Sequence, residues 1–479
     1  MKKIFSSIYI QASILYVILG ILPRAINFLL LPIYLEHLAV VEYGKLVLIT
    51  LYVGLFNVFG YFQLNIAAST QYFSKNIDKE TYRTSLLITG FLLSTLMFIL
   101  FASSGELFFS LYEAELNFYP LGFVSLVSAI LMLWYTMFFT FMKNEYQIKA
   151  FGVFSLALTI LGVAFQIYFI IYLDWGLSGI IYGGFFSQII VLPFLLFYYR
   201  KWMKIKSDNF KVLYKYGILA LKFSIPFLPT ILLHWAQTLG DRIVLERFVS
   251  LEKVGQYAVI VALITFPQMI VNATMNALKP KLLQLLNDKK YELINKIEFL
   301  YVNFIVLVLI LVFFIGTHLN WLTDNPKYIA VDQYLFIGIL VMLPSSLLYI
   351  NHLKLMVIEK TGVISKFSFY GFSIQALLLF LLVPTIGIYG ALIAFGMGGV
   401  VTYILNVKKV FRIKRYPFIR IIQPALLMVL INIIGYNLVN FMNFDIKVIS
   451  KVTTVLIICM TVILTRKTLM TIIPYLNKS

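Results

Sequence analysis

One charged side chain lies deep inside the first apolar run of the sequence, at 10–36. Arg24 falls about fourteen residues into that run, and it shares a helix face with Tyr16, Gly20 and Asn27. A guanidinium group is a planar fork that can bind phosphate oxygens through two parallel hydrogen bonds. The stripe therefore predicts a wet, anion-binding cavity, and an arginine that snorkels or pairs with a polar neighbour is the alternative.

A second polar helix face lies near the middle of the chain, in the apolar run at 217–240. Its members recur every three or four residues: Lys222, Pro226, Thr230, His234, Gln237 and Asp241. This pattern predicts the lining of a polar cavity on a helix kinked at its proline. Lys222 either contacts the ligand or snorkels to the membrane surface, and His234 is either a proton relay or a hydrogen-bonded structural residue.

Asp241 and Arg242 stand at the outer end of this run and are candidates for a gate or for ion coupling. Because sequence neighbours point to different sides of a helix, each is expected to find its partner on another span. An interfacial salt bridge is the alternative.

Polar residues also correspond between two segments that lie 211 residues apart. The aligned pairs are Asn57 with Gln268, Tyr61 with Asn272, and Asn65 with Asn276. Each set follows one helix face, and Asn57, Gln268 and Asn272 are expected to line the cavity. The alignment predicts two copies of one unit in the same orientation, related by an axis along the membrane normal.

The composition indicates that membrane-spanning helices position these residues. Of 479 residues, 61% are hydrophobic and 12% are charged, whereas soluble domains have roughly 25% charged residues. Fourteen apolar runs are long enough to cross a bilayer: 10–36, 43–66, 84–104, 118–141, 150–173, 177–199, 217–240, 254–277, 297–317, 331–351, 365–385, 387–407, 420–442 and 446–465. The expected fold is all-α and polytopic, with about fourteen transmembrane helices.

The distribution of the basic residues among the loops indicates how these spans are oriented in the membrane. The chain has 39 Lys and Arg against 20 Asp and Glu, a net charge of +19. With a cytoplasmic N-terminus, 30 of the cations fall on the cytoplasmic side, seven on the opposite side and two within spans. This asymmetry predicts that both termini are cytoplasmic. The basic loops then contact anionic lipid head groups, and nucleic acid is excluded as a partner.

All loops are too short to hold a soluble domain, and a basic stretch divides the chain near its middle. The expected organisation is an N-terminal six-helix lobe at 1–199 and a cytoplasmic linker at 200–216. A second six-helix lobe at 217–407 and two accessory helices at 420–465 follow.

Motifs for catalysis or cofactor binding do not occur in the sequence. There is no Walker motif, HExxH zinc motif or nucleophile elbow, and the single cysteine, Cys459, lies in an apolar run. The glycine-rich segment 396–399 lies inside a span and indicates close helix packing. We expect neither enzymatic activity nor a metal or cofactor, with a proton or a sodium ion as the candidates for coupling.

Several segments carry a resemblance to a known family. They are 24–34 (RAINFLLLPIY), 42–44 (EYG), 221–229 (LKFSIPFLP) and 254–257 (VGQY), together with Trp235 and the Asp241-Arg242 pair. They resemble the Wzx-type O-antigen and capsule flippases, which are polysaccharide transporters of the multidrug/oligosaccharidyl-lipid/polysaccharide exporter superfamily. Length, span count and midpoint linker extend the resemblance over the whole chain.

The resemblance implies a MATE-like flippase with two lobes around a cavity that alternates in access. Such a protein moves undecaprenyl-diphosphate-linked oligosaccharide repeat units from the cytoplasmic to the outer leaflet of the bacterial inner membrane. The implied partners are this lipid-linked oligosaccharide diphosphate and membrane lipids, with a polysaccharide polymerase and a chain-length regulator as further candidates.

Three other functions remain open from the sequence. A lipid II flippase would share the fourteen-span plan. A cation-coupled multidrug exporter of the same superfamily would need carboxylates in the membrane, but Glu36 and Asp241 both stand near span ends. A membrane-embedded glycosyltransferase would need acidic catalytic residues and normally a large outer loop, and neither is visible.

We predict that Arg24→Ala abolishes export of surface polysaccharide because it removes the positive charge that offsets a diphosphate in the membrane. Arg24→Lys should keep part of the activity, since it keeps the charge but loses the bidentate geometry. Export is measured in a strain lacking the chromosomal gene, with immunoblots to show normal protein levels. Full export by Arg24→Ala would refute the role in the cavity.

Overall fold

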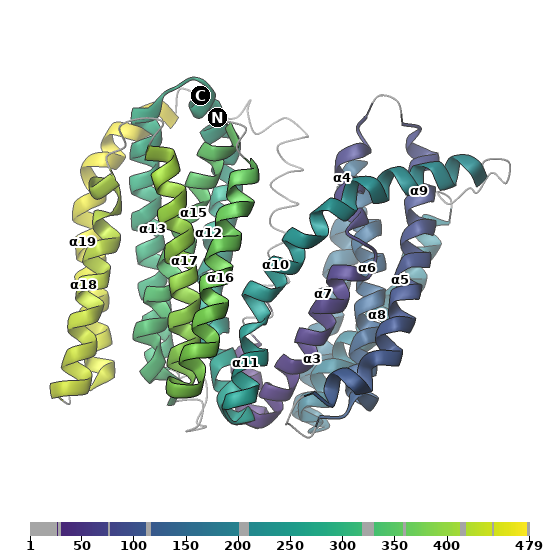
Figure 1. Cartoon of the computed structure of the whole chain (residues 1–479), viewed down its shortest axis with the longest axis horizontal. Coiled ribbons are helices and arrows are strands. Elements are labelled where there is room, and N and C mark those ends of the chain that lie inside the picture. The colour runs from purple at the N-terminus through teal and green to yellow at the C-terminus, as the bar shows by residue number, and fades with distance from the viewer. Residues whose placement is uncertain are drawn as a thin grey trace. The chain divides into compact units, whose positions relative to one another are not determined.

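A computed structural model describes the chain at residue 26 and at 30–74, 77–111, 116–200, 210–318, 330–357, 361–411, 418–442 and 445–476. All regular elements in these ranges are helices (Figure 1). Twelve helical segments of the described residues are long and apolar enough to cross a membrane. The predicted all-α, multi-span fold is thereby confirmed. Of the fourteen predicted spans, the first lies largely outside the described residues, and the eighth falls within one long helix at Leu251–Asn287.

The described residues up to Arg247 form one compact unit, which we call the N-terminal unit. Its helices are α2 (Leu31–His37), α3 (Val40–Phe59), α4 (Leu64–Gln71), α5 (Lys79–Phe109), η1 (Phe118–Gly122), α6 (Phe123–Asn144), α7 (Ile148–Ile167), η2 (Tyr168–Tyr172), α8 (Gly176–Tyr199), α9 (Phe210–Ser224), η4 (Ile225–Phe227), α10 (Leu228–Leu239) and α11 (Asp241–Phe248). Hydropathy locates these helices well, because a span in hydrocarbon must satisfy its backbone hydrogen bonds internally and so stays helical.

The described residues from Phe248 onward form a second compact unit, the C-terminal unit. Its helices are α12 (Leu251–Asn287), α13 (Tyr291–Thr317), η6 (Ala330–Tyr334), α15 (Leu335–Val357), α16 (Thr361–Ile386), α17 (Ile388–Phe411), α18 (Phe418–Met442) and α19 (Ile446–Leu476). Helices α18 and α19 pack together and against α13 (Figure 1).

The contacts between residues divide the described chain into two units near residue 247, which is later in the sequence than the linker predicted at 200–216. Helix α9 lies across the end of the bundle where α5 begins (Figure 1). Ser85 donates a hydrogen bond to the Leu213 carbonyl, and the rings of Tyr82 and Tyr216 meet edge to face. These contacts join residues 210–247 to the N-terminal unit, although the predicted second lobe begins at 217. The division into two six-helix lobes and accessory helices stays a prediction.

The predicted proline kink is present between α9 and α10. The 3₁₀ turn η4 contains Pro226, which cannot continue an α-helical hydrogen-bond ladder. The Ser224 hydroxyl donates to the Ala220 carbonyl at 2.7 Å and so satisfies one acceptor next to the break.

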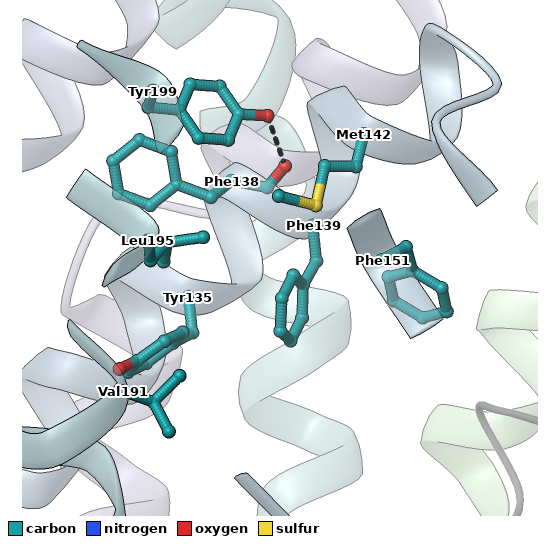
Figure 2. Packing of buried hydrophobic residues seen from close by; sticks show 8 residues of the cluster. All are labelled: Tyr135, Phe138, Phe139, Met142, Phe151, Val191, Leu195 and Tyr199. Atoms are coloured by element: carbon teal, nitrogen blue, oxygen red, sulfur yellow. Dashed lines mark hydrogen bonds between the residues drawn. The ribbon is translucent and has the colours of Figure 1, made fainter. Parts of the chain in front are cut away.

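The core of the N-terminal unit is an aromatic cluster between α6, α7 and α8. Figure 2 shows the ring of Tyr199 next to that of Phe138, tilted by 46° to it, with the Tyr199 hydroxyl donating to the Phe138 carbonyl at 3.0 Å. Tyr135 donates in the same way to the Gln188 carbonyl at 2.8 Å. Each buried hydroxyl thus has a partner inside the protein, which matters where no water can supply one.

A buried ion pair joins α5 to the turn between α6 and α7. The Arg83 guanidinium contacts the Glu145 carboxylate, and both side chains are nearly inaccessible. Tyr72 donates to Glu145 Oε1 at 2.8 Å, and Gln147 donates to Glu145 Oε2 at 2.7 Å. Burial and the Glu145 carboxylate raise the pKa of Tyr72, so its hydroxyl stays protonated and remains a donor.

The C-terminal unit has a corresponding ion pair with the charges exchanged. Lys354 Nζ near the end of α15 lies 2.6 Å from Glu298 Oε2 in α13, and both side chains are buried. Under the 211-residue offset, Arg83 aligns one helical turn before Glu298 and Glu145 aligns two residues after Lys354. Each unit thus has a buried ion pair at a similar place in the alignment. The basic residue comes first in the N-terminal unit and the acidic residue comes first in the C-terminal unit, which supports the internal repeat.

We predict that Glu145→Gln lowers the free energy of unfolding by about 3–5 kcal/mol, because it leaves the buried Arg83 without its counter-charge. The charge-exchanged double variant Arg83→Glu/Glu145→Arg should regain part of this loss, because the C-terminal unit uses that order of charges. Thermal unfolding of the purified protein in detergent measures both effects. An unchanged melting temperature for Glu145→Gln would refute the structural role.

Candidate functional site

A polar pocket of about 400 Å³ opens between α3, α6 and α10 of the N-terminal unit. Its apolar walls include Val58, Met132, Leu133 and Ile231. Its polar or amphipathic lining residues are Asn57, Tyr61, Gln63, Thr136, His234, Trp235 and Thr238. We call it the polar pocket. Among the described residues that line it there is no Asp, Glu, Lys or Arg, so apart from His234 the site offers only neutral polar groups.

The close approach of α10 to α3 forms one wall of the polar pocket. The Trp235 indole Nε1 donates to the Leu51 carbonyl at 3.3 Å. A Cβ atom at Gly54 would lie 2.9 Å from that Nε1 and 2.9 Å from Leu239 Cδ1. Only glycine leaves room for the indole here, so Gly54 sets the distance between the two helices.

A break between α3 and α4 forms another wall. Phe62 and Gln63 have φ of 51° and 58°, the left-handed region that side chains other than glycine rarely adopt. The Gln63 amide donates to the carbonyls of Asn57 and Val58, each at 3.1 Å. These are two of the acceptors that a helix leaves unpaired at its C-terminal end. The predicted span at 43–66 is therefore interrupted, and irregular backbone lines a cavity, as expected at membrane depth.

The side chains of Asn57 and His234 are free to bind a ligand. Both are exposed to the pocket, and neither side chain has a hydrogen-bond partner within the described part of the chain. The neighbouring Thr238 hydroxyl is already occupied, since it donates to the His234 carbonyl at 2.8 Å. An amide and an imidazole with free donors and acceptors, beside an indole and a phenol, suit an uncharged polyhydroxylated ligand.

The structure brings together two of the residues predicted from the sequence, Asn57 and His234. On α9 and α10, Lys222 and Thr230 are exposed and Gln237 is half-buried, and none of them lines the polar pocket. Gln268 belongs to the C-terminal unit, where its Oε1 accepts a hydrogen bond of 2.8 Å from Ser346.

The other predicted cavity residues cannot be placed in a site. Arg24 and Asn27 lie outside the described residues, and so does the side chain of Asn272. Their roles in the cavity stay predictions.

Asp241 and Arg242 contact each other, and the prediction that each has a partner on another span stays a prediction. Arg242 Nη1 lies 2.8 Å from Asp241 Oδ1 and 2.6 Å from the Thr238 carbonyl, and both side chains are buried. The two residues are the first two of α11, which begins directly after Gly240 at the end of α10. A role in gating or coupling stays a prediction.

Three polar lining residues were missed by reasoning from the sequence. Gln63 has its backbone in the left-handed region, and no local sequence pattern predicts that conformation. Thr136 is one of two threonines on the mostly apolar α6, and no polar stripe at helical spacing marks it. Thr238 lies one turn after His234 and could have been found by extending the helix face from that residue.

The sequence was compared with known protein families. The model of the family described as "Polysaccharide biosynthesis protein" matches residues 10–286 of this chain. The chain belongs to this polysaccharide biosynthesis family. The matched region contains the polar pocket, and the predicted membership in a polysaccharide family is confirmed. No curated protein matches the sequence.

Solved membrane transporters share the fold of this member of the polysaccharide biosynthesis family. The lipid II flippase MurJ in an inward closed conformation aligns with a TM-score of 0.69 at 14% identity, over 96% of this chain and 100% of that chain. An inward-facing multidrug resistance MATE transporter of the MOP superfamily aligns at 0.61 and 13% identity, over 82% and 99%. A MOP superfamily transporter from Pyrococcus furiosus aligns at 0.53 and 13% identity, over 84% and 94%. The predicted MATE-like, multi-pass membrane fold is confirmed.

We predict that Gly54→Ala lowers the thermal stability of the protein, because the added Cβ would displace Trp235 from the Leu51 carbonyl. Gly184→Ala is the matched control: its Cβ would meet only Gln166 Nε2, at 3.9 Å, so the better helix propensity of alanine should leave stability equal or higher. Unfolding of both variants in detergent is followed by circular dichroism. Equal stabilisation by the two substitutions would contradict the packing described for α10.

Proposed function

We propose that this protein is a flippase that moves undecaprenyl-diphosphate-linked oligosaccharide repeat units, of O-antigen or capsule, across the bacterial inner membrane. The movement runs from the cytoplasmic to the outer leaflet by alternating access. The observation that carries the proposal is the polar pocket, which offers neutral hydrogen-bonding and aromatic groups within the spans of a transporter fold. Membership in the polysaccharide biosynthesis family supports a glycan as cargo.

The chemistry of the polar pocket suits sugar rings. Amide and imidazole groups exchange hydrogen bonds with hydroxyl groups, and the indole and phenol can stack on the apolar faces of pyranose rings. A cationic drug would instead need an acidic partner, and none of the described lining residues is acidic. In this proposal the diphosphate is held outside the pocket, with Arg24 as its predicted partner.

Lipid II is the second candidate substrate, because the structure aligns with the lipid II flippase MurJ over 96% of the chain. Lipid II is also a lipid-linked saccharide diphosphate, so both substrates would use the same kinds of contact. Deletion of the gene distinguishes between these two candidate substrates. Loss of surface polysaccharide with accumulation of lipid-linked repeat units supports the proposal, whereas arrested peptidoglycan synthesis and lysis would favour lipid II.

We predict that Asn57→Ala lowers the initial rate of oligosaccharide translocation in proteoliposomes about tenfold. One hydrogen bond of about 1–1.5 kcal/mol to a sugar hydroxyl would be lost, and 1.4 kcal/mol is a factor of ten. Thr50→Ala is the control on the same helix, because the Thr50 hydroxyl only donates to the Leu46 carbonyl. Equal rates for Asn57→Ala and wild type would exclude Asn57 from the sugar site.

A further inference from the structure

A second pocket of about 350 Å³ lies in the N-terminal unit between α5, α6 and α8. Its walls include Phe91, Met137, Phe138 and Leu196, and we call it the apolar pocket. Two residues, Tyr61 and Leu133, line both this pocket and the polar pocket. The two sites are thus neighbours within one unit, separated by two side chains.

Three polar side chains of the apolar pocket, Thr84, Ser94 and Trp134, already make hydrogen bonds within the protein. Trp134 Nε1 donates to Ser94 Oγ at 2.9 Å, and Ser94 Oγ donates to the Phe91 carbonyl at 3.1 Å. The Thr84 hydroxyl donates to the Glu80 carbonyl at 3.0 Å. A ligand in this pocket would gain free energy by removing apolar surface from water or lipid and by contact with the walls, and not by hydrogen bonds to these groups.

The rim of the apolar pocket is accessible from the membrane. Phe91 is 50% exposed, Leu92 61% and Leu196 39%, on helices that are long and apolar enough to span the bilayer. Such side chains face acyl chains, so an apolar chain could enter sideways from the lipid without crossing water.

The pocket also lies toward one end of the unit. Its residues come from the first half of α5, the second half of α6 and the end of α8. The positive-inside prediction assigns this end to the cytoplasm, since Lys79 and Arg200 flank it. A substrate synthesised in the cytoplasmic leaflet would therefore meet this pocket on the side from which it enters.

We propose that the apolar pocket binds the prenyl chain of the transported substrate, at the isoprene units next to the diphosphate. The saccharide then lies on the other side of Tyr61 and Leu133, in the polar pocket. This inference rests on the proposed flippase function and adds a defined site for the lipid part of the cargo. An amphipathic substrate would use two adjoining sites of opposite polarity, whereas a free sugar or a bulk phospholipid would use only one of them.

Gly90 provides the substitution that fills the pocket. Its added Cβ would meet Met137 Cε at 3.5 Å and Leu64 Cδ1 at 3.8 Å, which are ordinary contacts, so alanine fits. Gly90→Leu would occupy the space of the ligand, and Gly90→Ala is its matched control. Leu196→Trp covers the rim from an exposed position and serves as an independent variant if Gly90→Leu does not fold.

The test is photolabelling in proteoliposomes with a diazirine-bearing undecaprenyl diphosphate. We expect label in the peptides that contain residues 84–94 and 133–138, with removal by excess undecaprenyl diphosphate and not by phosphatidylglycerol. Gly90→Leu or Leu196→Trp should lower this label at least fivefold, and Gly90→Ala should not. Label that these variants leave unchanged, or that phosphatidylglycerol removes equally well, would overturn the proposal and indicate, in the second case, a general lipid site.

Transport by the same vesicles separates this inference from the proposed function. If wild-type protein does not translocate the lipid-linked oligosaccharide, the flippase function fails. If wild type translocates it and Gly90→Leu and Leu196→Trp do so at the same rate, only the prenyl site fails. At least a fivefold loss of rate in these variants, with normal rates for Gly90→Ala, supports both.

Discussion

The close packing of α10 on α3 is the interaction on which the candidate site depends. Trp235 reaches the Leu51 carbonyl only because Gly54 leaves the space for its indole. That contact fixes the face of α10 that carries His234 opposite the end of α3 that carries Asn57. Without this contact, Asn57 and His234 would not line one pocket, and α10 would not pack over the break after α3.

The hydrocarbon interior of a membrane explains why many buried polar groups in this unit are paired within the protein. Buried tyrosine hydroxyls donate to carbonyls, Gln63 satisfies the end of α3, and Arg83 and Glu145 neutralise each other. Asn57 and His234 differ from these groups because their side chains are exposed to the polar pocket and have no partner within the described residues. Polar groups that the fold leaves unsatisfied at membrane depth are where a ligand is expected to bind.

The two ion pairs at corresponding places suggest that each unit derives from one ancestral arrangement. Arg83 with Glu145 and Glu298 with Lys354 connect the same two helices of each repeat, with the charges exchanged. The Coulombic attraction is insensitive to which helix carries which sign, so such an exchange preserves the junction while changing the sequence.

The sequence predicted the helices much better than the site. Long apolar runs identify spans because only helices satisfy the backbone in lipid, and helical spacing was enough to select Asn57 and His234. The contribution of Gln63 depends on a left-handed backbone, and the contact between Asp241 and Arg242 is made in the first turn of α11; neither follows from periodicity. Lys222 shares the predicted polar face with His234, but the 3₁₀ turn η4 separates its helix α9 from α10.

The most direct test of this account compares two substrates in proteoliposomes that contain the purified wild-type protein. One is an undecaprenyl-diphosphate-linked oligosaccharide, whose arrival in the opposite leaflet is detected by a membrane-impermeant lectin, and the other is a cationic dye. The account predicts protein-dependent translocation of the oligosaccharide and no accumulation of the dye. Transport of the dye with no movement of the oligosaccharide would contradict it.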